Sequence, residues 1–177
     1  MDYGLLVLRV VLGLLLAGHG AQKLFGWFGG SGLRPTAEGF SQLRYRAPFL
    51  VALLGGLTEF VGGLLFATGF LTPLAALGIA ALMINAVAVA HWSNGLWATK
   101  GGWEYNLLIY AVLIAVVTTG PGAFSIDAVI GLAAATSGLV WAVGVLVLSA
   151  VLAAAALTLG RKPDRALTPA PAADAGH

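Results

Sequence analysis

Five long runs of apolar residues, separated by short polar breaks, make up most of the chain. Crossing a bilayer as a helix takes about 17 to 25 mostly apolar residues. None of the runs alternates polar and apolar residues at every second position, as the strands of a membrane barrel do. The pattern therefore predicts five transmembrane helices, at about 5–28, 48–70, 73–92, 103–119 and 128–159.

The breaks between the runs predict how these helices connect. Residues 29–32, Gly-Gly-Ser-Gly, stop the first helix, and a short interfacial helix is expected at about 36–44 in the polar loop that follows. The turn at 71–73 is so short that the second and third helices should form an antiparallel hairpin. We therefore expect an all-α integral membrane protein, with an antiparallel four-helix bundle followed by a fifth transmembrane helix.

Composition excludes several classes of protein. Of the 177 residues, 59% are hydrophobic and 9% charged, whereas soluble domains carry about 25% charged residues. The absence of cysteine excludes thiolate metal sites, iron–sulfur clusters and disulfide exchange by this chain alone. A net charge of +2 without a basic stripe gives no reason to expect a nucleic-acid partner. The expected surroundings are a lipid bilayer.

The distribution of Lys and Arg predicts the orientation of the chain, because cytoplasmic loops are enriched in both. Eight of the nine Lys and Arg residues lie on the membrane face that holds the first loop, the third loop and the tail. The opposite face has only Arg9, which we expect to reach the interface or to pair with Asp2. We therefore expect a multi-pass plasma-membrane protein with its N-terminus outside and its C-terminus cytoplasmic, provided that the fifth helix crosses fully. The cationic residues on the first-loop, third-loop and tail side are Lys23, Arg34, Arg44, Arg46, Lys100, Arg161, Lys162 and Arg165.

Polar residues from four of the predicted helices lie toward the same membrane face. At about 1.5 Å per residue, Lys23 and His91 lie within about 6 Å of that face, His19 and Asn85 at about 10 to 12 Å, and Glu59 at about 16 Å. Ionisable groups at such depths are costly and often functional. The sequence predicts a ligand-binding or proton-carrying pocket made of His19, Gln22, Lys23, Glu59, Asn85, His91 and Glu104.

Each of these residues also has a structural interpretation. His19 and Lys23 are four residues apart on one helix face, where Glu59 could pair with both, but Lys23 could equally extend to the interface. The glycines at 55, 56, 62 and 63 favour close helix packing over room for a ligand. Asn85 is a typical interhelical hydrogen-bonding residue, and His91 and Glu104 lie near helix ends, where polar side chains are common.

Several motifs resemble the DoxX family. Residues 19–26 read His-Gly-Ala-Gln-Lys-Leu-Phe-Gly, and Glu59 is followed by Gly-Gly-Leu-Leu at 62–65. The match continues with Gly-Phe-Leu-Thr at 69–72, Gly-Trp-Glu-Tyr at 102–105 and Gly-Pro-Gly-Ala-Phe-Ser-Ile-Asp at 120–127. The resemblance implies a four-helix DoxX-like domain at 1–127. Residues 128–160 are then an added transmembrane helix, and 161–177 a disordered cytoplasmic tail.

The resemblance also implies a function, since DoxX relatives are described as subunits of quinone-linked thiosulfate oxidoreductases or as membrane partners of soluble redox enzymes. The leading hypothesis is a redox-associated subunit of a bacterial inner membrane that binds quinone in the polar pocket, with another redox protein or subunit as partner. Whether the chain itself is catalytic stays open, as does formation of a homo-oligomer.

Two alternatives belong to other functional classes. One is a non-catalytic scaffold or chaperone that recruits a soluble redox enzyme through the loop at 34–46. The other is a b-type haem protein ligated by His19 and His91, although their depths differ, or a metal site built from His19, Glu59, His91 and Glu104 without diagnostic spacing.

Overall fold

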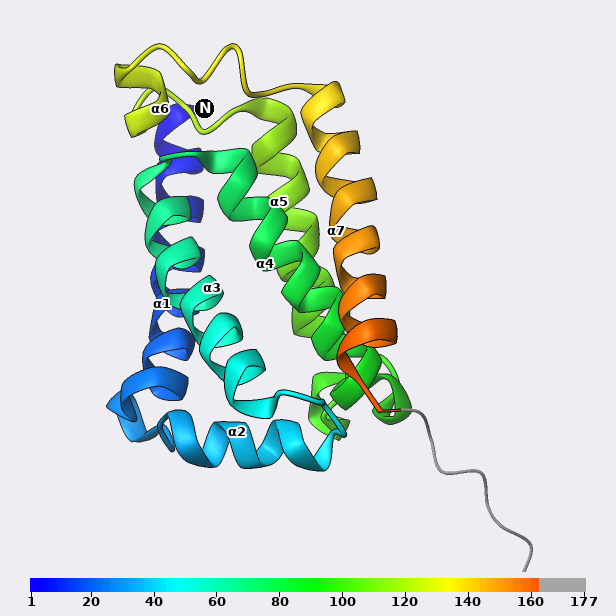
Figure 1. Ribbon diagram of the computed structural model, residues 1–177. Coiled ribbons are helices and arrows are strands. Elements are labelled where there is room, and N and C mark those ends of the chain that lie inside the picture. The colour runs from blue at the N-terminus through cyan, green and yellow to red at the C-terminus, as the bar shows by residue number, and fades with distance from the viewer. Residues whose placement is uncertain (163–177) are drawn as a thin grey trace, which may run out of the picture.

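The computed structural model of the protein describes residues 1–162, and it shows an all-α membrane protein, as the sequence predicts. The long helices stand side by side and α2 lies across one end of them (Figure 1). The helices are α1 (Asp2–Phe25), α2 (Leu33–Gln42), α3 (Pro48–Thr68), α4 (Thr72–Ala86), α5 (Glu104–Thr119), α6 (Ile126–Val129) and α7 (Leu139–Gly160).

Four helical stretches in the described part of the chain are long and apolar enough to cross a bilayer: α1, α3, α7, and α4 with its continuation to Asn94. The continuation starts with a π-helical turn, Val87–His91. The fifth apolar helix, α5, has 16 residues and is about 24 Å long, less than the roughly 30 Å of a typical hydrocarbon core. Helix α5 is therefore counted as a shorter apolar helix and not among the four candidate spans.

The predicted helix ends differ from the observed ones where glycine or a cap decides. Helix α1 ends at Gly26, whose left-handed conformation (φ 74°) is the usual helix-terminating geometry, so Trp27–Gly29 forms a separate 3-10 turn. The last helix begins at Leu139 rather than at residue 128. The apolar residues before it are divided between α6, which Ser125 caps by accepting a hydrogen bond from the Ala128 amide, and an irregular segment.

Helix α4 is the centre of the bundle. It packs against α3, α5 and α7, while α1 packs mainly against α3, and α2 lies under α3. The buried core includes Phe66 of α3, Ile79 of α4, and Leu113 and Val116 of α5. The outward faces of the long helices carry exposed apolar side chains, as expected for helices in contact with lipid.

Different elements of the chain lie at the two ends of the bundle. The N-terminus, α6 and the start of α7 lie at one end, whereas α2 and the end of α7 lie at the other (Figure 1). Arg161 and Lys162 contact the segment after α2: the Lys162 amide donates to the Arg44 carbonyl and Arg161 Nε to the Leu43 carbonyl. The rest of the tail predicted to be disordered, 163–177, lies outside the described residues.

Candidate functional site

The candidate site lies where α1 crosses α3 at backbone contact distance. A Cβ atom added to Gly13 would lie 2.5 Å from the Gly63 carbonyl oxygen, and one added to Gly63 would lie 2.6 Å from the Ala17 amide nitrogen. Gly20 is equally tight, since its Cβ would lie 2.7 Å from the Gly56 carbonyl oxygen. Small residues permit such an approach between membrane helices. The packing interpretation is therefore confirmed for Gly56 and Gly63, whereas Gly55 and Gly62 make only ordinary contacts.

This close approach joins α1 to α3 through an ion pair. Lys23 Nζ lies 2.5 Å from Glu59 Oε1, with the lysine side chain 34% exposed and the glutamate side chain 6% exposed. A single charge at this depth would be costly, and a partner of opposite sign offsets part of the cost. The predicted pairing of Glu59 with Lys23 is therefore confirmed, and Lys23 does not extend freely to the interface.

The second carboxylate oxygen of Glu59 is different. Oε2 is buried and accepts no hydrogen bond from any residue between 1 and 162. Buried carboxylate oxygens normally have partners, because leaving one unmatched costs free energy. Glu59 therefore presents a strong acceptor that the described part of the protein does not satisfy.

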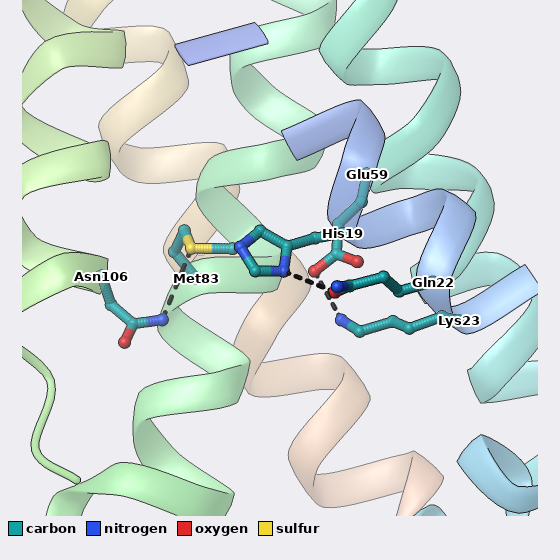
Figure 2. A network of polar contacts seen from close by, with 6 residues as sticks. All are labelled: His19, Gln22, Lys23, Glu59, Met83 and Asn106. Atoms are coloured by element: carbon teal, nitrogen blue, oxygen red, sulfur yellow. Dashed lines mark hydrogen bonds and ion pairs between the residues drawn. The ribbon is translucent and has the colours of Figure 1, made fainter. Parts of the chain in front are cut away.

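His19 and Gln22 extend the cluster along α1 (Figure 2). His19 Nδ1 lies 3.2 Å from Gln22 Oε1, and Gln22 Nε2 donates to the Phe28 carbonyl at 3.2 Å. Because Gln22 Oε1 can only accept, Nδ1 of His19 carries the proton, and a neutral imidazole then has Nε2 free to accept. The His19 side chain is exposed on the bundle surface, and Figure 2 shows its ring pointing away from α1 toward Met83 and Asn106.

The other three predicted site residues do not join this cluster. Asn85 accepts a hydrogen bond from the Tyr45 hydroxyl. His91 Nδ1 lies 2.9 Å from the Gly101 carbonyl oxygen, and Glu104 Oε2 accepts from the Ala98 amide at 2.9 Å. His91 and Glu104 thus order the loop between α4 and α5.

This separation bears on the metal and haem alternatives. Within residues 1–162 no group of three or more His, Asp or Glu side chains is placed to hold a metal ion. His19 and His91 each direct Nδ1 to a partner in a different part of the fold. The described residues therefore do not gather the predicted four-residue metal site.

Comparison with known proteins supports the resemblance noted in the sequence. The DoxX family model matches residues 4–92, which is half of the chain. The chain belongs to the DoxX family. It is also 29% identical over 126 residues to the inner membrane protein YqjF of Escherichia coli (strain K12), an alignment covering 71% of this chain and 91% of that protein. No solved structure matches the chain significantly.

The DoxX match includes the whole polar cluster and stops near the end of the α4 continuation. His19, Gln22, Lys23 and Glu59 lie inside it, whereas Glu104 and α7 lie beyond it. The sequence resemblance extended to residue 127, so the family model covers the part of that range up to residue 92. Helix α7 packs on α4 and α5 of the DoxX protein, away from the α1–α3 contact.

The prediction that Arg9 reaches the interface or pairs with Asp2 was wrong. The Arg9 side chain is fully buried and donates to the Phe124 carbonyl at 2.7 Å and to the Ala67 carbonyl at 3.4 Å. Asp2 instead accepts from the Ala123 amide at 3.0 Å. Arg9 can be buried because the chain after α5 folds back over the N-terminal part of α1 and supplies a carbonyl acceptor. The sequence pattern of α1 alone does not show this contact.

Asp127 is the structural residue that the sequence did not reveal. Its carboxylate accepts from the Leu71 amide at 2.8 Å and from the Thr72 amide and hydroxyl at 2.9 and 2.7 Å. It therefore caps the start of α4 from a distant part of the chain. The only local signal was the ending of the 120–127 motif in an aspartate.

Proposed function

We propose that this DoxX protein is a redox-associated membrane subunit that binds the polar headgroup of a quinone beside Glu59. The observation that carries the proposal is Glu59 Oε2, a buried carboxylate oxygen with no donor among the described residues. A hydroxyl group of the reduced form of the ligand, the quinol, would satisfy that oxygen, whereas the carbonyl groups of the oxidised quinone can only accept hydrogen bonds. A bound quinone would supply two-electron, two-proton redox chemistry.

The residues around Glu59 would have different roles in such a site. Lys23 is held 2.5 Å from Glu59 Oε1, so its ammonium group can donate to a ligand oxygen at the same place. His19 Nε2 can accept from a hydroxyl, and Glu59 can carry a proton. Because His19 is exposed on the surface of a candidate membrane-spanning helix, a lipid-soluble ligand can reach the His19 ring from the bilayer.

The absence of cysteine means that the electron donor for this site comes from elsewhere. We infer a second redox protein or subunit that docks at the α2 end of the bundle. We also infer the plasma membrane as location, the bacterial inner membrane in the case of the relative YqjF. The concentration of basic residues at the α2 end favours a cytoplasmic position for that end.

Quinone content tests the proposal directly. The full chain is purified from membranes with its lipids retained, and bound quinone is extracted and quantified by chromatography. Glu59→Gln and His19→Ala should lower the quinone per protein by about tenfold, the effect of one lost charge-assisted hydrogen bond. Glu104→Gln and His91→Ala make the same chemical changes outside the cluster and should leave it unchanged. Wild-type protein without quinone, or equal loss in all four variants, would contradict the proposal.

The scaffold function is a second candidate, because every hydrogen bond of the cluster among the described residues is internal. One lies within α1, one joins α1 to the Trp27–Gly29 turn, and one joins α1 to α3. In that case Glu59→Gln lowers the stability of the protein while quinone content and activity stay unchanged. Recruitment of a soluble partner would then depend on Arg34, Arg44 and Arg46 of the first loop.

A further inference from the structure

A narrow groove opens between α3 and α7 at the α2 end of the bundle. Its volume is about 250 Å³, and α4 forms its floor. Small residues make up much of the wall, among them Gly55 of α3, Gly78 of α4, and Ala153 and Ala156 of α7. Its polar side chains, Tyr45 and Asn85, hydrogen-bond each other, so the groove is otherwise suited to a slender apolar chain.

A cluster of cationic residues borders one end of this groove. Tyr45 and Gly160 line it, and each is followed in the chain by an arginine. The two arginines are held by main-chain acceptors: Arg46 Nε donates to the Arg161 carbonyl and Arg161 Nε to the Leu43 carbonyl, both at 3.1 Å. A guanidinium group held through Nε still has two NH₂ groups that can donate to another acceptor.

Among the described residues, no carboxylate balances the charge of this cluster. Within residues 1–162 no carboxylate forms a salt bridge with Arg46, Arg161 or Lys162. Lys162 is brought to the same place because its amide donates to the Arg44 carbonyl at 2.9 Å. Three cations therefore border the mouth of an apolar groove at the end of a membrane-spanning helix.

We propose that the groove and the three cations together bind one anionic phospholipid. One acyl chain lies in the groove, and the phosphodiester accepts hydrogen bonds from Arg46, Arg161 and Lys162. Charge complementarity selects an anionic over a zwitterionic headgroup, and it disfavours a second copy of the chain, whose own cations would meet these three. The site is separate from the Glu59 cluster, so it does not depend on the quinone proposal.

The charge part of the proposal is tested by titrating the full-length protein in detergent with phosphatidylglycerol and phosphatidylcholine of identical acyl chains. Binding is read by native mass spectrometry. Wild-type protein should prefer phosphatidylglycerol by a factor on the order of ten, and Arg46→Gln with Lys162→Gln should abolish the preference. Arg46→Lys keeps the charge and should retain it, as should Arg34→Gln with Lys100→Gln, which removes two charges at the same end of the bundle.

The groove part needs a steric test. Ala156→Phe fills the groove from α7, whereas Ala154→Phe places the same ring on an exposed position outside it. Ala156→Phe should weaken binding of both lipids several-fold, and Ala154→Phe should not. The proposal is overturned if wild-type protein does not discriminate the two lipids, if the neutralised variant behaves like its control, or if both phenylalanine variants bind equally. A change from dimer to monomer in Ala156→Phe would assign the groove to a second copy instead.

Discussion

Glu59 lies at the middle of α3, where a bilayer offers its carboxylate no water. Lys23 neutralises one oxygen and leaves the other without a partner in the described residues. Removing one member of such a pair leaves an uncompensated charge, while replacing both members costs much less. The contributions of the two charges to stability should therefore be coupled.

A double-mutant cycle measures the energetic coupling between Lys23 and Glu59. Lys23→Met and Glu59→Gln should each lower the free energy of unfolding by on the order of 2 kcal/mol, less than for a fully buried pair because Lys23 reaches the surface. The double variant should lose less than the sum of the two. Tryptophan fluorescence during thermal unfolding in detergent provides the measurement, with the exposed Lys100→Met as control. Strictly additive losses would show that the two side chains are not coupled.

Tyr45 gives a residue-scale prediction on pH. Burial raises the pKa of its phenol above the ordinary value of 10.0, and the hydrogen bond to Asn85 and the charge of Arg161 lower it by less. A pKa raised by folding means that the stabilisation is fully present below about pH 10 and is lost as the pH rises through the folded value. Wild-type protein should therefore lose stability in alkali more steeply than Tyr45→Phe.

The measurement is the melting temperature in detergent from pH 8 to 11. The matched control is Tyr105→Phe, because Tyr105 is 67% exposed and its loss should leave the alkaline slope of the wild type unchanged. At neutral pH, Tyr45→Phe should cost about 1 kcal/mol for the lost hydrogen bond to Asn85. If both variants show the wild-type slope, ionisation of Tyr45 does not limit alkaline stability.

At the scale of elements, the contact between α1 and α3 depends on glycine rather than on large side chains. Gly13 and Gly63 face each other across it, and their backbones leave no room for a methyl group. The contact also sets the distance between Lys23 and Glu59, since both side chains leave these helices within a few turns of it. Helix packing and site geometry are thus coupled.

Substitution of these glycines should separate the two helices. Gly63→Ala should lower stability by about 1 to 3 kcal/mol, as overpacking does, and should weaken the Lys23–Glu59 coupling. Gly18→Ala is the control on α1, because its added methyl group meets nothing within 4 Å and alanine favours helix. Thermal unfolding gives the first quantity, and the double-mutant cycle repeated in the Gly63→Ala background gives the second. Equal melting temperatures for both alanine variants would refute tight packing at Gly63.

At the scale of the whole molecule, the asymmetry of charge is stronger in the structure than in the sequence. Arg9, the cation expected at the opposite face, is buried and bound to carbonyl groups. Lys23, Arg34 and Arg46 lie with the start of α3 and the end of α7 at the α2 end, which is opposite the N-terminus (Figure 1). The prediction that the α2 end faces the cytoplasm rests on this distribution.

Single cysteines can test that orientation without background, since the chain has none. Ser41→Cys in α2 and Ala134→Cys in the segment before α7 are both exposed and lie at opposite ends of the bundle. In intact cells with a permeable outer layer, a membrane-impermeant maleimide should label Ala134→Cys at once. It should label Ser41→Cys only after the plasma membrane is opened. The reverse order would invert the topology.

The sequence by itself determined the class of protein, the positions of five apolar helices and most of their ends, although only four of the five are long enough to count as candidate spans. A bilayer demands about 20 apolar residues per helix and satisfies backbone groups only within regular structure, so local composition is sufficient for these features. It also indicated Glu59 and Lys23 as partners, because depth can be counted along a helix.

Only the tertiary structure decided which polar residues meet. The pattern of a helix does not specify how that helix is rotated or which helices pack against it. The seven predicted site residues therefore lie in three places: the Glu59 cluster, the Tyr45–Asn85 pair, and the loop held by His91 and Glu104. Arg9 and Asp127 acquired their partners from segments more than 50 residues away. Contacts over such distances depend on how the helices assemble, which no local signal specifies.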